Sequence, residues 1–130
     1  MIVVDTNIIA YLYLLCEFTA HAEQLLQTQP NWAAPFLWRS EFRNILAGYL
    51  RRDILTYQQA VQIQREAEAL MAGFEFEVHS TRVLQLVSSS NCSAYDCEFV
   101  ALALEQNIPL FTLDKKILQS FPDVAASLTG

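Results

Sequence analysis

The sequence has no long apolar run and few basic residues. No stretch approaches the ~18 consecutive apolar residues of a membrane-spanning helix, so no membrane protein is expected. The segment Met1–Asp5 has no basic region and reaches an acid at once, unlike a signal peptide. Eight lysines and arginines against fourteen acids give a net charge of −6, which disfavours sequence-independent nucleic-acid binding. A phosphate-bearing partner would need a cation or a local basic rim.

Cysteine and histidine are also scarce. The three cysteines, Cys16, Cys92 and Cys97, form no CxxC pair and leave an odd number, so a disulfide framework is not expected. The two histidines lie far from any clustered cysteine, which argues against a zinc site. This cysteine usage fits a reducing cytoplasm.

What is present suits a globular fold. The 130 residues are 53% hydrophobic and 17% charged, with no repeat and no glycine- or serine-rich linker, so we expect one domain over residues 1–130. Short apolar runs alternate with helical patterns, which predicts an α/β sandwich with a mainly parallel sheet. The expected strands are 2–4, 32–35, 74–78 and 109–114. The first expected helix begins near residue 7. The other expected helices cover 19–29 (capped by Thr19), 35–53, 56–73 (stopped by Gly73), 80–90, 93–104 and 115–121.

Four acids each have an ordinary structural interpretation. Asp5 and Asp114 each follow a strand and precede a helix, as helix N-caps do. Asp96 is the third residue after Ser93, which is the spacing of a capping box. Glu41 could be a solvated helix residue. Taken singly, each of these interpretations is adequate.

Together the acids are harder to explain by capping alone. Each helical residue turns about 100°, so Asp96 lies roughly 200° from Glu98, whose face looks solvated. Asp96 is therefore predicted at the buried edge of its helix. Neither Glu41 nor Asp96 has a basic residue three or four positions away, where a helical ion pair would form. A buried carboxylate without a partner is costly, so something must compensate it.

A metal ion would supply that compensation. In open α/β sheets the site lies at the carboxyl ends of the strands, where Asp5, Asp114 and the early-helix Asp96 can converge, with Glu41 joining from its helix. Clustered carboxylates repel one another, and a bound Mg²⁺ or Mn²⁺, which prefers oxygen ligands, would reverse that cost. The chemistry that fits is metal-assisted hydrolysis of a phosphodiester.

Four segments, in order, resemble the PIN-domain ribonucleases and most closely the VapC-type toxins of bacterial toxin–antitoxin pairs: "IVVDTNIIAYL", "SEFRNIL", "SAYDCEFVALAL" and "LFTLDKKIL". The resemblance implies a PIN-like three-layer α/β/α sandwich with a short, mainly parallel central sheet. It implies an endoribonuclease that cuts RNA with Mg²⁺ or Mn²⁺, forms a homodimer and is silenced by a cognate antitoxin protein.

The resemblance also implies residue roles. The catalytic and metal-binding acids would be Asp5, Glu41, Asp96 and Asp114. Asn7 would support Asp5, and Thr112 would line the site. The basic residues that might face RNA are Arg39, Arg43, Lys115 and Lys116, and the alternative is that they are ordinary surface charges.

Three other functions stay open. An aspartate-nucleophile phosphatase would also place an acid like Asp5 after the first strand, but the usual general acid two residues later is here Asn7. The domain could instead be a non-catalytic module that binds RNA or protein. It could also cut DNA, because nothing in the sequence reports on the 2′-hydroxyl.

Overall fold

A computed structural model describes all 130 residues and contains a five-stranded sheet. Every strand pair is parallel, and the strand order is β3-β2-β1-β4-β5. The strands are β1 (Ile2–Val4), β2 (Trp32–Pro35), β3 (Glu75–Phe76), β4 (Leu110–Thr112) and β5 (Ala125–Ser127). The predicted α/β sandwich with a parallel central sheet is confirmed.

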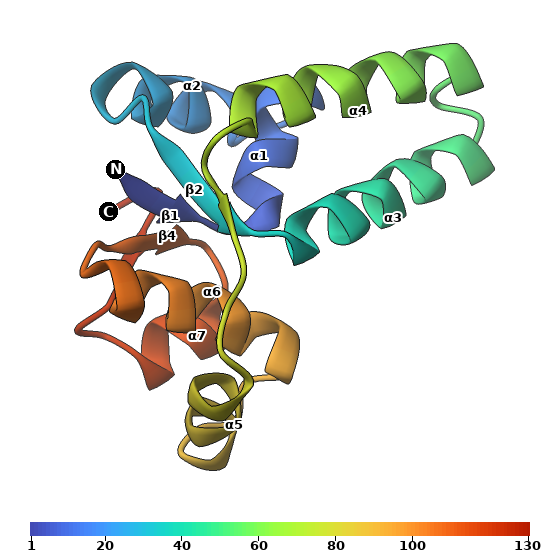
Figure 1. The fold of residues 1–130 in the computed structure, drawn as a ribbon. Helices are drawn as coiled ribbons and strands as arrows, with labels where there is room; N and C mark the ends of the chain where they lie inside the picture. The colour runs from blue at the N-terminus through green and yellow to red at the C-terminus, as the bar shows by residue number, and fades with distance from the viewer.

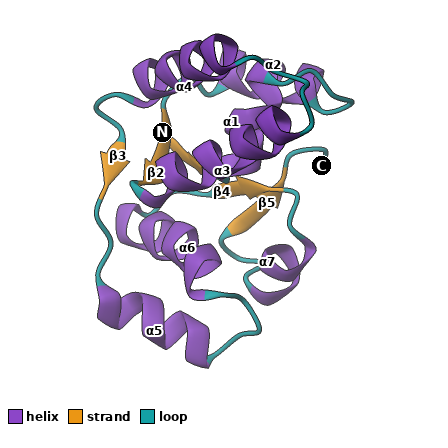
Figure 2. Ribbon diagram, turned by 90° about the vertical axis from the view of Figure 1, so that its right-hand side faces the viewer, coloured by secondary structure: helices purple, strands orange, loops and turns teal.

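Helices cover both faces of the sheet (Figure 1). One face carries α1 (Thr6–Tyr13), α2 (Thr19–Thr28), α3 (Leu37–Arg51) and α4 (Tyr57–Met71). The other carries α5 (Ser80–Ser88), α6 (Ala94–Gln106) and α7 (Lys115–Ser120). The helices α3 and α4 form a hairpin that extends beyond the sheet, and α5 packs mainly on α6 (Figure 2). No helix is both long enough and apolar enough to cross a bilayer.

The core lies where the central strands meet the helices. Strand β1 is buried along its whole length, and so is β2, because strands covered on both faces carry continuous apolar runs instead of an alternating pattern. Helix α6 is buried over Phe99–Ala103 and packs on β1 and β2. The bulky side chains of Trp38 and Phe42 anchor the first half of α3.

The direction in which successive strands are added to the sheet reverses at the pair β1 and β4. The chain adds β2 and β3 on one side of β1 and then crosses over to β4 on the other side. Such a switch point opens a crevice at the carboxyl ends of the two neighbouring strands. The register pairs Val4 with Phe111, and the Asp5 N–H donates to the Phe111 carbonyl at 3.1 Å. The residues that follow these two strands are therefore held side by side.

Some local predictions were wrong. Thr19 does not cap α2: Phe18 is the N-cap, and the Thr19 hydroxyl instead donates to the Tyr11 carbonyl at 2.7 Å. The strand expected over 74–78 is only Glu75–Phe76, which pairs with β2 alone at the edge of the sheet. Strand β5 was not predicted. The expected stop after α4 is confirmed, because the helix ends at Met71 and Gly73 adopts φ +86°.

Candidate active site

Asp5 lies at the switch point, directly after β1. It is the N-cap of α1, and its Oδ1 accepts from the Thr6 N–H at 2.8 Å. Its Oδ2 accepts from the hydroxyl of the fully buried Thr112, also at 2.8 Å. These two bonds fix the carboxylate, so its capping role and its place in a site are compatible.

Glu41 reaches the same region from the second turn of α3. Its Oε1 accepts from the hydroxyl of Thr6 at 2.7 Å. Thr6 therefore holds two acids, because its backbone N–H binds Asp5 and its side chain binds Glu41. The sequence reasoning missed this buried threonine, although a hydroxyl directly after a strand-end aspartate was a usable signal.

Asp96 lies in the first turn of α6, and only half of the expected capping box forms. The Ser93 hydroxyl accepts from the Asp96 N–H at 3.0 Å, but the Asp96 carboxylate returns no hydrogen bond to Ser93. The carboxylate is half-buried and accepts no hydrogen bond from the protein, which leaves its oxygens free for a ligand. Glu98 was expected on a solvated face, yet it is half-buried too, and burial raises its pKa.

Asp114 completes the group from the loop after β4. It caps α7 through Oδ1, which accepts from the Ile117 N–H at 3.1 Å. Its own N–H donates to the Thr112 hydroxyl at 3.0 Å. Since Thr112 also donates to Asp5, this one side chain links the ends of the two strands that flank the switch point. Thr112 is fully buried and does not line the cavity of the acids.

The four acids line one cavity of about 240 Å³, which we call the acidic cavity. They come from four different segments of the chain, and none of them forms an ion pair. The other lining residues are Thr6, Asn7, Asn44 and Ile45. Asn7 was expected to support Asp5, but it makes no hydrogen bond to it; Thr6 provides that contact.

The electrostatics of the acidic cavity favour neutralisation of its carboxylates, by a proton or by a bound cation. Burial raises the pKa of Asp5, and the nearby charges of Asp96 and Asp114 raise it further, against the lowering effect of its hydrogen bonds from Thr112 and Thr6. Burial likewise raises the pKa of Glu41, with Asp5 and Asp96 adding to it. Carboxylates that raise one another's pKa across an open cavity are a frequent feature of functional sites.

The donor set fits a hard divalent cation, but the ligands are not gathered around a single point. Carboxylate and amide oxygens are the ligands that Mg²⁺ and Mn²⁺ take. No three acidic, histidine or cysteine side chains lie in an arrangement that would hold a metal ion as they stand.

The basic residues lie outside this cavity. Arg39 is bound on the far side of α3, where it pairs with Glu75 at 2.5 Å and with Glu68 at 3.1 Å. Arg43 is exposed, and its side chain donates a hydrogen bond only to the Ser40 hydroxyl. Lys115 and Lys116 are exposed in the first turn of α7, directly after Asp114. None of the four lines the acidic cavity.

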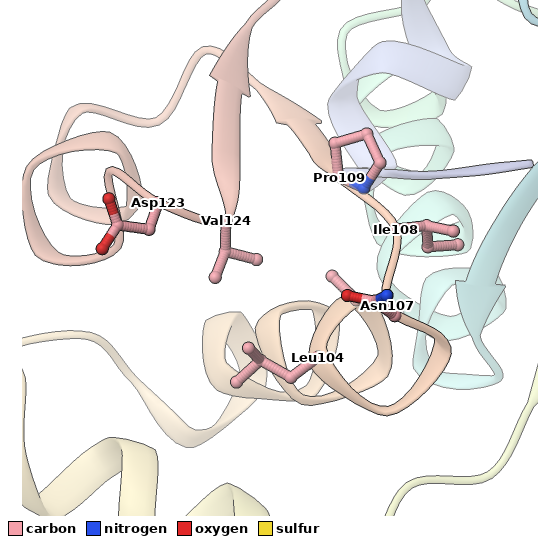
Figure 3. Close-up of a pocket in the computed structure, with 7 residues that line it drawn as sticks. Leu104, Asn107, Ile108, Pro109, Asp123 and Val124 are labelled. Atoms are coloured by element: carbon pink, nitrogen blue, oxygen red, sulfur yellow. The ribbon is translucent and has the colours of Figure 1, made fainter.

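A second cavity, of about 280 Å³, lies at the opposite edge of the sheet. It is bounded by the end of α6 and by the residues that precede β4 and β5, and the Val124 and Leu104 side chains face each other across it (Figure 3). Asp123 is its one acidic residue. The concentration of acids is therefore specific to the carboxyl edge.

Comparison with known protein families identifies the family of this chain. The family model described as the PIN domain matches residues 2–125. The chain belongs to the PIN domain family. A search of curated proteins gave no match by sequence.

Solved structures share this architecture over 96 to 100% of the chain. A chain of a toxin–antitoxin complex from Klebsiella pneumoniae superposes with a TM-score of 0.73 at 20% identity, covering 98% of each chain. A chain of FitAcB from Neisseria gonorrhoeae gives 0.74 at 18% identity, covering 96% of this chain and 95% of that one. A chain of FitAB bound to an IR36 DNA fragment gives 0.76 at 19% identity, covering 100% and 96%.

Proposed function

We propose that this PIN domain is a metal-dependent endoribonuclease that hydrolyses RNA phosphodiester bonds. The observation that carries the proposal is the convergence of four carboxylates from four separate segments on one cavity, with no basic partner among them. PIN domains are generally nucleases, which agrees with this chemistry.

The four acids would be the catalytic residues and would hold Mg²⁺ or Mn²⁺. They are Asp5, Glu41, Asp96 and Asp114. A divalent cation bound there would supply the positive charge that activates water and stabilises charge developing on the phosphodiester. Thr6 and Thr112 orient the acids through the hydrogen bonds described above. Lys115 and Lys116, exposed beside Asp114, are the basic side chains best placed to attract the RNA backbone.

We further propose that the protein is the toxin of a toxin–antitoxin pair. Structural neighbours belong to a toxin–antitoxin complex and to the FitAB assembly, which supports a cognate antitoxin as partner. A homodimer and a cytoplasmic location complete the proposal, and the three free cysteines fit a reducing compartment.

The test is cleavage of a mixed pool of structured RNAs by the purified protein with Mg²⁺, with Mn²⁺ and with EDTA. Asp96→Asn is the active-site variant, and Asp123→Asn is the matched acid-to-amide control in the distant cavity. Cleavage that requires metal, persists in Asp123→Asn and disappears in Asp96→Asn is the expected result. Equal cleavage by both variants would contradict the site. A DNA pool of the same sequences separates ribonuclease from deoxyribonuclease activity.

A non-catalytic module that binds RNA or protein is the second candidate. The acids of the acidic cavity are not gathered around a single point, which is compatible with binding without cleavage. Metal-dependent thermal stabilisation without cleavage of any RNA or DNA pool would support this alternative.

A further inference from the structure

A small apolar pocket adjoins the acidic cavity. It has a volume of about 140 Å³, lies between α1 and α3, and shares Asn7 and Ile45 with the acidic cavity as common walls. Its other walls include Ala10 of α1 and Leu14, the residue that caps the end of α1. A molecule bound across the shared wall would therefore place one part among the acids and a neighbouring part in this pocket, which we call the side pocket.

Two tyrosines line the side pocket. Tyr11 and Tyr49 are both half-buried, and neither hydroxyl makes a hydrogen bond within the protein. Burial raises the pKa of the Tyr11 phenol, and the nearby Cys16 and Asp5 add to that shift, so this ring stays neutral near pH 7. Aromatic rings stack on nucleobases and can hold a base in a fixed place.

Asn7 supplies a polar group at the boundary between the two cavities. Its side chain is exposed and makes no hydrogen bond in the structure, although the resemblance to PIN-domain ribonucleases implied that it would support Asp5. A free amide carries two N–H donors and one acceptor oxygen, which can bond the edge of a base.

A fixed positive charge lies beside the side pocket. The guanidinium carbon of Arg52 lies 4.8 Å from the centroid of the Tyr49 ring, and its Nε donates to the Gly48 carbonyl at 3.2 Å. In a chain with a net charge of −6, an arginine held in this way is a local attraction for a phosphate.

We propose that the side pocket binds the nucleobase adjacent to the phosphodiester held at the acidic cavity. The base stacks on Tyr49 and Tyr11, Asn7 bonds its edge, and Arg52 attracts the next backbone phosphate. This inference rests on the proposed nuclease function and adds a determinant of its base preference. An aliphatic protein side chain would fill the apolar walls but would leave the Asn7 amide and the Arg52 charge without a role.

The first experiment maps base preference. A pool of RNAs randomised around the cut is cleaved and the ends are sequenced, and we expect the wild type to favour certain bases at one position next to the cut. Tyr49→Leu keeps apolar volume but removes the ring that holds the base edge against Asn7, and it should lower that preference about tenfold. Tyr49→Phe should retain the preference, because the Tyr49 hydroxyl has no partner. Tyr57→Leu, a change at an exposed tyrosine of α4, is the matched control and should also retain it.

The second experiment separates this inference from the nuclease itself. The four ribonucleoside 5′-monophosphates contain no internucleotide bond, so their binding with Mg²⁺ can be followed by NMR whether or not the protein cuts. We expect shifts at Asn7 and Tyr49 and about tenfold weaker binding in Tyr49→Leu. Asn7→Ala, at an exposed position, gives the same test if Tyr49→Leu fails to fold.

The outcomes are distinct. Cleavage whose base preference survives both Tyr49→Leu and Asn7→Ala would overturn the side-pocket inference and leave the nuclease standing. Absence of cleavage with nucleotide shifts at Asn7 and Tyr49 would overturn the nuclease and keep the base-binding pocket. Shifts caused by N-acetyl-leucine amide but by no nucleotide would assign the side pocket to a protein side chain and overturn the inference.

Discussion

Two glutamates beside the first half of α3 have opposite surroundings. Glu75 accepts hydrogen bonds from the Trp38 indole at 2.8 Å and from two nitrogens of Arg39 at 2.5 and 2.7 Å. Those bonds from Arg39 and Trp38 hold its pKa below the usual range. Glu41 accepts only the Thr6 hydroxyl, and burial raises its pKa.

The contrast arises on a single helix. Arg39 and Glu41 are two residues apart in α3, so their side chains leave the helix roughly 200° from each other. One face of α3 brings a cation to the carboxylate that ties down the edge strand β3. The other face brings a carboxylate without a cation to the switch point. Neutralisation within the protein thus marks a structural acid, and its absence marks a candidate functional one.

The largest effect that would test this contrast is expected from Asp96→Asn. We expect cleavage to fall at least about a hundredfold, because charge stabilisation at a reacting centre is lost. We expect the melting temperature of the metal-free protein to be unchanged or higher, since the Asp96 carboxylate accepts no hydrogen bond and its charge repels Asp5. Thermal denaturation in EDTA together with the cleavage assay checks both. A large loss of stability would assign Asp96 a structural role.

Glu75→Gln should show the reverse pattern. Removing the charge weakens three hydrogen bonds to a side chain that is only 7% exposed, so the free energy of unfolding should fall by about 2 kcal/mol. Cleavage per folded molecule should be unchanged. Glu77→Gln, an exposed neighbour without a partner, is the matched control for chemical denaturation. Equal stability of the two variants would remove the contrast between structural and functional acids.

Thr112→Val probes how the site acids are held. The change keeps shape but removes the hydroxyl that donates to Asp5 and accepts from the Asp114 N–H. Because residues that orient metal ligands typically contribute a factor of ten or more, activity should fall about tenfold. Thr112→Ser restores the hydroxyl and should recover most of it. Steady-state cleavage rates at saturating Mg²⁺ decide this, and a fully active Thr112→Val would show that Asp5 needs no such support.

The sequence predicted the fold and the four acids, but it did not predict which residues hold those acids in place. Periodicity placed the helices and four of the strands because each pattern is local. Strand β5, with the sequence Ala-Ala-Ser, carries no β-branched signal and forms by pairing with β4. The Thr6 bridge to Glu41 spans 35 residues and the Arg39 pair with Glu75 spans 36, so no local pattern reports either contact. The side pocket likewise depends on how α1 and α3 pack.

The smallest expected effect is a difference in pH dependence between the two kinds of acid. The lowered pKa of Glu75 means that its contribution to stability is present above its ordinary value of 4.5 and is lost as the pH falls through its lower folded value. The raised pKa of Asp5 has the opposite sign. Above its ordinary value of 3.8 the unfolded chain releases the proton first, so stability falls as the pH rises through the higher folded value.

Denaturation curves in EDTA from about pH 3 to about pH 8 should separate these signs. The stability lost in Glu75→Gln should shrink toward zero in acid, because the wild-type carboxylate is then protonated as well. Asp5→Asn should gain stability relative to the wild type as the pH rises, since the variant has no charge left to bury. The stability differences of Glu75→Gln and Asp5→Asn from the wild type could instead change with pH in the same direction. The surroundings of the two acids would then not be opposed, and the absence of a cation at the switch point would no longer identify the site.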